Sequence, residues 1–270
     1  MNNEDLHKNL YSMVTRETPT RPSQMAQTTE ITMTPKQAVP IVKINDWLDK
    51  PEEPEKPVVD NLIWGNTFCA IVGSPKSGKS TLARQLAYCI ATGEMFLGHE
   101  TVQQPVLYLA LEEYSGRVRE HFRTLGVKSE DPLYIVWDRL RNNPYDLVIE
   151  GLKLQLQELQ IGVLIIDTAV HMPTKGATGV MDYNESINWW SDYLDIAHQL
   201  GVCVILIYHM PKNASNNPNR NPINSIFGST GLGSIVDQAY AVWINDDGIR
   251  SFESEGRLPV LNDTLLDFNA

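Results

Sequence analysis

A glycine-rich stretch, GSPKSGKS, joins an apolar run to an amphipathic segment and constrains the fold more than any other part of the chain. Its spacing, two glycines five residues apart followed by Lys79 and Ser80, is that of a phosphate-binding P-loop. The preceding run, residues 67–73, has the composition of a buried parallel strand. The residues that follow place their apolar side chains on one face of a helix ending at Gly93. The sequence therefore predicts a strand, a phosphate-binding turn and a helix in succession.

The rest of the chain repeats this alternation. Apolar runs of strand length are followed by amphipathic segments of helical length, which is typical of a mainly parallel sheet with helices on both faces. The further predicted strands are residues 105–111, 132–137, 162–167 and 202–208. The segment VVDNLIW, residues 58–64, is expected to add a short edge strand packed onto the core. We therefore predict an α/β fold built on a twisted, mainly parallel sheet.

Composition divides the chain into a tail and one domain. Residues 1–40 are rich in Thr, Gln, Asn, Ser and Pro and carry few apolar side chains. Such a segment cannot bury enough apolar surface to offset the entropy of ordering, so we predict a disordered N-terminal tail. Residues 41–270 are expected to form the globular domain, which is long enough for one sizeable core.

Charge and cysteine content exclude several classes of protein. The formal net charge of -11 argues against a protein that coats nucleic acid with its whole surface, although it is compatible with a local basic channel. Cys69, Cys89 and Cys203 sit unclustered in apolar runs, which predicts buried thiols rather than disulfides or a zinc site. No run has the length of a membrane span, and the first residues lack a signal-peptide core. We expect a cytoplasmic protein with no membrane partner.

The P-loop motif predicts how the chain holds the phosphates of ATP. Backbone N–H groups of a glycine-rich turn point at the β-phosphate, and the next helix adds its positive N-terminal end. Lys79 is expected to reach the β- and γ-phosphates, and Ser80 to ligate Mg²⁺. The predicted nucleotide-binding residues are Gly73, Ser74, Pro75, Lys76, Ser77, Gly78, Lys79, Ser80 and Thr81.

Three other strand ends carry polar candidates. Asp167 closes the run GVLIID, where it can hold a metal-bound water beside Ser80, although an aspartate that merely caps the next segment fits the same position. Glu112 and Glu113 end another apolar run, and we favour Glu112 as the general base, with Glu113 as its alternate. His209 ends the run ILIYH, where it can sense the γ-phosphate; the alternative is a hydrogen-bonded structural histidine.

With these motifs in hand, the chain resembles the RecA-like ATPases, and among them the family of the plasmid replication helicase RepA and its relatives in phages and mobile elements. The resemblance covers residues 44–270. It rests on an ordered set of motifs: WLDKPEEP, VDNLIW, IVGSPKSGKSTLARQLAYCIATGEMFLG, VLYLALEE, VLIIDT, ILIYHMPK, IFGSTGLGSIVDQAYAVW and ESEGRLPVL. It implies a RecA-like P-loop core that hydrolyses ATP between neighbouring subunits of a ring, commonly a hexamer, with DNA in the central channel.

The resemblance also assigns roles by position. It makes Glu112 the catalytic glutamate, Asp167 the Walker B aspartate and His209 the γ-phosphate sensor. Arg257 falls where relatives place an arginine that reaches a neighbour's nucleotide, with Arg250 as the fallback. Many ring helicases carry a basic residue two positions before that arginine, whereas this chain has a glutamate at position 255.

The loops predicted at residues 172–186 and 210–234 would line the channel of such a ring. Both leave the carboxyl ends of strands, where ligands of open α/β sheets bind. Several copies of their cations would create local positive potential, while a surface loop that touches nothing is the alternative. Phe227 is the one candidate for base stacking, so we expect contact with the DNA backbone rather than base readout. The candidate DNA-binding residues are Lys212, Arg220 and Lys175.

The motifs together predict an ATP hydrolase that acts as a DNA helicase in replication, as a hexameric ring on single-stranded DNA. The alternative is a nucleotide-gated DNA-binding or recombination and assembly ATPase without unwinding activity. The chain shows no obvious primase, zinc or winged-helix module, which favours that alternative. A metabolic kinase is disfavoured, because no lid with paired arginines lies between the P-loop and Asp167.

Overall fold

The computed structural model describes residues 41–51, 56–175, 183–210, 220–226, 230–261 and 264–267. The chain forms two compact units, residues 1–53 and 54–270. In the first unit, α3 (Ile44–Leu48) is a single short helix with no buried residue. The predicted tail, residues 1–40, lies outside the described residues, so the tail and its boundary at residue 41 stay predictions.

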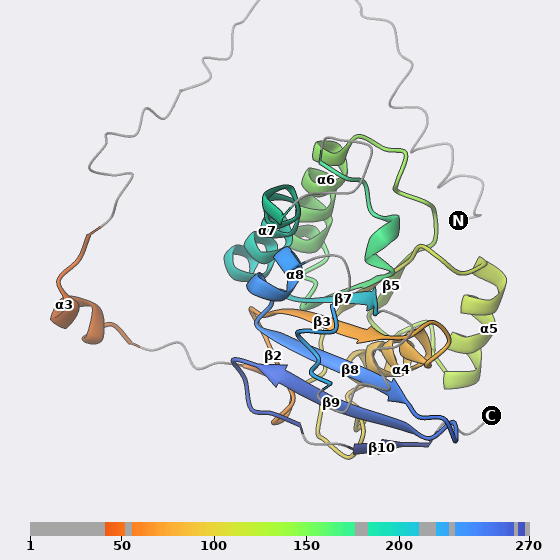
Figure 1. Cartoon of the computed structure of the whole chain (residues 1–270). Coiled ribbons are helices and arrows are strands. Elements are labelled where there is room, and N and C mark those ends of the chain that lie inside the picture. The colour runs from red at the N-terminus through yellow and green to blue at the C-terminus, as the bar shows by residue number, and fades with distance from the viewer. Residues whose placement is uncertain are drawn as a thin grey trace, which may run out of the picture. The chain divides into compact units, whose positions relative to one another are not determined.

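The second unit is built on an eight-stranded sheet (Figure 1). Its strands are β3 (Phe68–Gly73), β4 (Val106–Ala110), β5 (Leu133–Val136), β6 (Val163–Asp167), β7 (Cys203–His209), β8 (Gln238–Ile244), β9 (Arg250–Gly256) and β10 (Thr264–Leu266). They lie in the order β10-β9-β8-β3-β7-β6-β4-β5. Every neighbouring pair from β8 to β5 is parallel, and β9 and β10 extend the sheet with antiparallel pairs. The predicted mainly parallel α/β sheet is confirmed.

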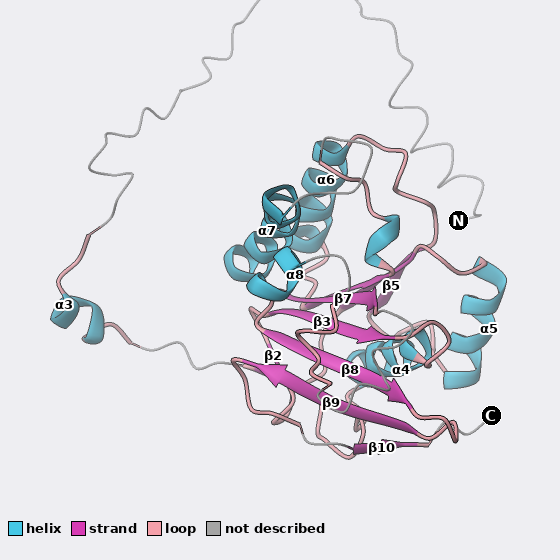
Figure 2. Ribbon diagram, viewed as in Figure 1, coloured by secondary structure: helices cyan, strands magenta, loops and turns pink. Residues whose placement is uncertain are grey.

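Helices cover both faces of this sheet (Figure 2). One face is covered by α4 (Lys79–Thr92) and α5 (Ser115–Leu125). The other is covered by α6 (Tyr145–Glu158), α7 (Tyr183–Leu200) and α8 (Thr230–Ile235). A 3₁₀ turn at Ala169–His171 follows β6. The arrangement explains why β3, β4 and β6 are apolar along almost their whole length, since both faces of these strands are covered.

The strand β3 shows how the sheet feeds two separate cores. All six of its residues are buried. Successive side chains of a strand point to opposite faces, so Ala70 and Val72 join the cluster under α6 and α7, while Cys69 and Ile71 join the cluster under α4. The helix that follows ends at Gly93, whose φ of 78° lies in the left-handed region that a side chain would strain. The sequence-based prediction for this strand and helix is confirmed.

The segment predicted as one edge strand forms a separate hairpin instead. β1 (Pro57–Val59) pairs antiparallel with β2 (Ile63–Trp64) in a two-stranded sheet of its own. Asn61 adopts a positive φ of 54° in the turn, which allows the chain to reverse within three residues. Val58, Val59, Leu62 and Ile63 are buried, so the expected packing onto the core is confirmed although the single strand is not.

The end of the chain contains structure that the sequence did not predict. The short helix α8 overlaps the end of the predicted loop 210–234, and its Leu232 is buried against the cluster around α7. Gly231 permits this approach, since a Cβ there would lie 2.9 Å from Ser186. The three strands β8, β9 and β10 were also missed. The apolar run of β8 was not read as a strand, and the sequence of β9 is mostly polar, with Phe252 as its one apolar residue.

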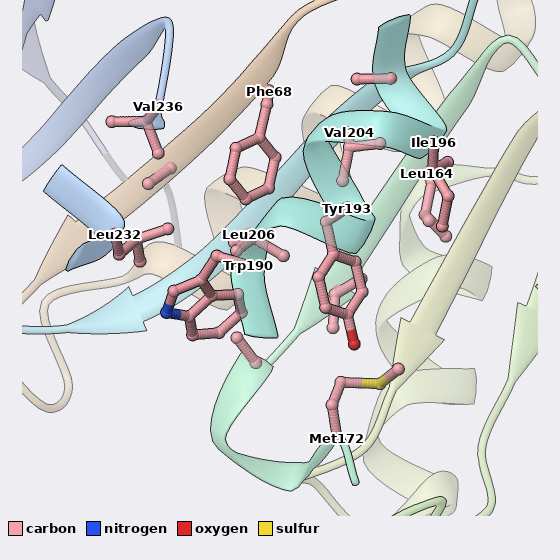
Figure 3. Packing of buried hydrophobic residues seen from close by; sticks show 14 of the residues in the cluster. Phe68, Leu164, Met172, Trp190, Tyr193, Ile196, Val204, Leu206, Leu232 and Val236 are labelled. Carbon is pink, nitrogen blue, oxygen red and sulfur yellow. The ribbon is translucent and has the colours of Figure 1, made fainter. Parts of the chain in front are cut away.

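The two tryptophans of α7 belong to the core. Trp190 is fully buried and packs with Phe68, Leu206 and Leu232 between the helix layer and the sheet (Figure 3). Trp189 is also buried and donates its indole N–H to the carbonyl of Pro173 at 2.9 Å. The three cysteines are buried and free, as predicted. Across the described residues, no helix combines the length and apolarity needed to cross a membrane.

The packing around Trp190 yields a prediction about stability. Replacing Trp190 with Ala removes one of the largest side chains of this cluster and should lower the free energy of unfolding by about 3–5 kcal/mol. Trp137 is 56% exposed and provides a matched control, whose replacement with Ala should change the free energy by about 0.5 kcal/mol or less. Urea unfolding followed by circular dichroism measures both. Equal losses in the two variants would show that α7 contributes little to the core.

Candidate functional site

The parallel strands bring several candidate residues to the same edge of the sheet. Gly73 closes β3 and is paired in register with His209 at the end of β7. Asp167 closes β6 and is paired with Ala110, the last residue of β4, so Glu112 follows two residues beyond that pair. The carboxyl ends of the central strands therefore place the P-loop beside the predicted carboxylates and histidine.

The P-loop turn is closely packed around Lys79. Its Nζ donates to the carbonyl oxygens of Gly73 and Ser74, both at 2.9 Å, and the residue is 5% exposed. Gly73 has no space for a side chain, because a Cβ would lie 2.6 Å from Ser77 Oγ and 2.8 Å from the carbonyl oxygen of Val242. The turn thus depends on a glycine where the strand ends.

The geometry of this turn fits the phosphates of a nucleotide. Ser77 Oγ is buried without a hydrogen-bond partner among the described residues, and a buried polar atom of this kind is stabilised by a bound acceptor. The helix α4 begins after Gly78, whose positive φ of 100° shapes the turn, and no side chain caps its first N–H groups. An anion at this helix end would satisfy those donors.

Ser80 and Asp167 form the pair that fits Mg²⁺. Ser80 Oγ donates to Asp167 Oδ1 at 3.0 Å, and Asp167 is 4% exposed. A hydroxyl and a carboxylate are oxygen ligands of the kind that Mg²⁺ prefers, and phosphate and water oxygens usually complete its octahedron. Among the described residues, no group of three or more His, Cys, Asp or Glu side chains could hold a metal by itself. The pair therefore fits a metal that arrives with a nucleotide.

The two neighbouring glutamates have different partners. Glu112 Oε2 lies 3.6 Å from His209 Nε2, on the side of the P-loop. Glu113 instead forms an ion pair with Arg84, a buried side chain of α4. Burial lowers the pKa of His209, and the nearby charge of Lys79 lowers it further, so the imidazole is mainly neutral at pH 7. Glu113 is thus engaged by a buried arginine, whereas Glu112 faces His209, and the choice of Glu112 as the base stays a prediction.

The two candidate arginines lie at opposite ends of β9. Arg250 Nε donates to the carbonyl of Ser77 at 3.1 Å and so contacts the P-loop of its own chain. Arg257 donates to Asp237 Oδ1 at 3.0 Å, and the other oxygen of Asp237 accepts from the backbone N–H of Phe68 at the start of β3. The β3 strand separates that point from the P-loop by about 17 Å, at the rise per residue of a strand. Arg257 therefore cannot serve its own P-loop, and its side chain is 67% exposed.

The candidate DNA-binding cations are engaged or lie beyond the described residues. Arg220 pairs with Glu253 at 3.0 Å and lies over the ring of Trp243. Lys175 pairs with Asp192 at 3.2 Å. Lys212 and the stacking candidate Phe227 lie outside the described residues. DNA contact by Arg220 or Lys175 would require these ion pairs to open, and their role in DNA binding stays a prediction.

A family model described as the AAA domain matches residues 34–215, which is more than half of the chain. The chain belongs to the AAA domain family. The match includes the P-loop, Glu112, Asp167 and His209. It ends before Arg220, Arg250 and Arg257, so the roles of these arginines are not covered by the family match. A comparison with curated proteins gives no match.

Solved structures with low sequence identity share the fold of this AAA domain. The ATPase domain of G40P is 14% identical, with a TM-score of 0.57 over 75% of this chain and 85% of that one. A KaiC-like protein from Pyrococcus horikoshii OT3 is 15% identical, with a TM-score of 0.51 over 81% of this chain and 92% of that one. Together with the mainly parallel sheet and the P-loop, these likenesses show a RecA-like P-loop ATPase fold.

Burial shifts the pKa values of Lys79 and Asp167, the two central charged groups of the site. Desolvation lowers the pKa of Lys79 to about 8, against the opposing attraction of Asp167 and Glu112. Desolvation also raises the pKa of Asp167, while hydrogen bonds from Tyr108 and Ser80 and the charge of Arg84 oppose that rise. The negative charges of Asp167 and Glu112 therefore do not fully offset the effect of burial on the pKa of Lys79.

Three contacts at the site were missed by the sequence analysis. Tyr108 donates to Asp167, Arg84 pairs with Glu113, and Arg250 contacts the P-loop in its own chain. A tyrosine inside an apolar strand carries no local signal for function. A charged residue on the otherwise apolar side of a helix is the signal that singles out Arg84, because such residues are rarely buried unless paired.

The lowered pKa of Lys79 predicts proton uptake on nucleotide binding. At pH 8 the free domain holds Lys79 about half protonated, and two phosphates beside it would raise its pKa, so binding should take up about half a proton per site. Calorimetric titration with ADP in buffers of different ionisation enthalpy measures this number. At pH 6.5 Lys79 is already charged and contributes no uptake.

Lys79→Arg is the matched control for this prediction. A guanidinium is charged at every accessible pH, so the variant should lose the Lys79 component of proton uptake at pH 8. Equal uptake in the original protein and the variant would contradict the assignment of the proton to Lys79.

Proposed function

We propose that the chain is an ATP-hydrolysing motor of the ring-helicase type that acts on single-stranded DNA in replication. One arrangement supports hydrolysis above all others: the Glu112–His209 pair lies at the same sheet edge as Lys79 and the Ser80–Asp167 contact. The DNA-related part is supported by the ordered set of sequence motifs and by the origin of two chain segments at that edge, after β6 and β7. ATP is the substrate, and Mg²⁺ the cofactor.

Each residue has a separate task in the proposed reaction. The P-loop N–H groups and Lys79 hold the phosphates of ATP. Glu112 would orient the attacking water and accept its proton. His209, which lies beside Glu112, would sense the γ-phosphate. Mg²⁺, when bound at Ser80 and Asp167, would neutralise charge on the phosphate oxygens. The loss of the γ-phosphate would then change the contacts of His209 and of the segment that follows β7.

Arg257 is proposed to complete the site of a neighbouring subunit. It lies at the amino edge of the sheet, is exposed, and cannot reach the P-loop of its own chain. An arginine supplied in trans stabilises the charge that develops during phosphoryl transfer, which makes hydrolysis depend on assembly. Head-to-tail contacts of this kind close into rings, and we propose a hexamer. Arg250 contacts its own P-loop and is not proposed for this role.

Substitution of the two glutamates separates chemistry from structure. Glu112→Gln keeps the size of the side chain but removes the base, so kcat should fall by about 10²–10⁴-fold while ADP affinity changes little. Glu113→Gln removes the ion-pair partner of Arg84, so it should lower the urea midpoint while kcat falls by less than about tenfold. Steady-state hydrolysis and urea unfolding measure both. A larger loss of kcat in Glu113→Gln would transfer the role of base to Glu113.

The DNA-dependent part is tested by the rate of ATP hydrolysis with and without single-stranded DNA. We expect stimulation by DNA that is lost in Lys79→Ala and Arg257→Ala, because the first variant loses phosphate contact and the second loses charge stabilisation in trans. Arg123→Ala replaces another exposed arginine and should retain the stimulation. A rate that does not respond to DNA would overturn the motor and favour nucleotide-gated binding or assembly without unwinding.

Mixing the two inactive variants tests whether Arg257 acts in trans. Lys79→Ala subunits supply an intact arginine and Arg257→Ala subunits supply an intact P-loop, so an equal random mixture should restore about a quarter of the active interfaces. Recovery of hydrolysis would also show that both variants are folded. No recovery, with both variants assembled as the original protein is, would contradict a shared site.

A further inference from the structure

Tyr108 links the proposed metal ligand Asp167 to the neighbouring strand. It is fully buried in β4, and its hydroxyl donates to Asp167 Oδ2 at 2.5 Å. The other carboxylate oxygen, Oδ1, accepts from Ser80 at 3.0 Å. The carboxylate of Asp167 is therefore held through both oxygens, from the P-loop helix on one side and from β4 on the other.

The sheet register explains why Tyr108 reaches this carboxylate. β4 and β6 pair in parallel, with Tyr108 opposite Ile165 and Ala110 opposite Asp167. Because side chains alternate between the faces of a sheet, Tyr108 and Asp167 lie on the same face as diagonal neighbours. The ring of Phe122 in α5 contacts the ring of Tyr108 edge to face, with 5.5 Å between centroids. The aromatic ring is thus held by packing, and its hydroxyl points at Asp167.

The Asp167 carboxylate sets the direction of the Tyr108 hydrogen bond. A carboxylate accepts hydrogen bonds and does not donate them, so the Tyr108 hydroxyl gives its single proton to Asp167. Arg84, a buried side chain of α4, is held by Glu113 and by His121 Nδ1, the latter at 2.9 Å. The donor that faces Asp167 is therefore fixed by the chemistry of its acceptor.

We propose that Tyr108 is a positioning residue for the Mg²⁺ site, because its hydroxyl keeps the Asp167 carboxylate oriented with Oδ1 toward Ser80. The proposal rests on the proposed function in one respect, namely that Asp167 and Ser80 bind Mg²⁺ with a nucleotide. Partners that hydrogen-bond to a metal ligand commonly change metal affinity or activity by about 10–100-fold when they are removed. Tyr108 touches neither the metal nor the substrate and acts through Asp167.

The variant Tyr108→Phe tests the proposal, because it keeps the ring and its contact with Phe122 and removes only the hydroxyl. Calorimetric titration with ADP, with and without Mg²⁺, measures how much Mg²⁺ strengthens binding, independently of turnover. We expect this gain to fall by about tenfold, while ADP affinity without Mg²⁺ stays as in the original protein. For ATP hydrolysis, kcat should fall by about tenfold with little change in KM.

Tyr193→Phe is the matched control. Tyr193 is a buried tyrosine of α7 on the other face of the sheet, and its hydroxyl has no hydrogen-bond partner among the described residues. Its replacement should leave both the Mg²⁺ effect and kcat unchanged. Comparable losses in the two variants would attribute the effect of Tyr108 to packing alone.

The outcomes separate this proposal from the proposed function. If the original protein binds ADP with Mg²⁺ but does not hydrolyse ATP, the proposed function fails, and the binding titrations still test Tyr108. If it hydrolyses ATP and Tyr108→Phe keeps the full Mg²⁺ effect, the positioning role is overturned. If the variant loses ADP affinity equally with and without Mg²⁺, Tyr108 supports the fold of the site and does not orient the metal ligand.

Discussion

The parallel, in-register pairing of β3 with β7 places the candidate site. It aligns Gly73 with His209, and the adjoining pairs of β7, β6 and β4 bring Asp167 and the glutamates to the same edge. A shift of one residue in any of these pairs would turn the strand's side chains to the opposite face. The two apolar cores oppose such a shift, because each strand buries residues on both faces. Site geometry and core packing therefore depend on the same register.

Buried charge is the second determinant of the site. Lys79, Arg84 and Asp167 are each at most 5% exposed, and such charges are costly unless partners compensate them. Arg84 finds its partners in the loop after β4 and in α5, whereas Lys79 is held by backbone carbonyls. Lys79, the residue expected to bind phosphate, is thus the buried charge that is not fully compensated. This difference distinguishes a residue prepared for a ligand from one that serves the protein's own structure.

The sequence predicted those parts of the site that depend on local pattern. The P-loop, its flanking strand and helix, and the strand-terminal Asp167 each follow from spacing and apolar period within a short window. The preference for Glu112 over Glu113 stays a prediction, and the partner that distinguishes the two glutamates, Arg84, lies on another element. Tyr108 was missed for the same reason, because its role follows from strand pairing that no local pattern encodes.

The strands that the sequence predicted are apolar runs. The apolar run of β8 was missed, and so were β9 and β10, which follow it. β5 was predicted from its apolar sequence although its residues are exposed or only partly buried, whereas β9, at the antiparallel side of the sheet, has a mostly polar sequence. The cations Lys175 and Arg220 illustrate a further limit of sequence reasoning. Each is balanced by an acid distant in sequence, Asp192 and Glu253, so a count of charges in a loop overstates the positive potential it presents.

The strand β9 spans the whole height of the sheet beside the site. Arg250 at its start holds the P-loop carbonyl of Ser77, and Arg257 directly follows its end at the opposite edge. All seven residues of the strand are paired with β8, and its length is about 20–24 Å. Because a fully paired strand cannot stretch, a displacement of the P-loop end would be transmitted along β9 to Arg257. In the ring that we propose, the same seven residues would connect the phosphate-binding turn of one site to the arginine that serves the next site. Adjacent sites would then be coupled through a single strand of the protein.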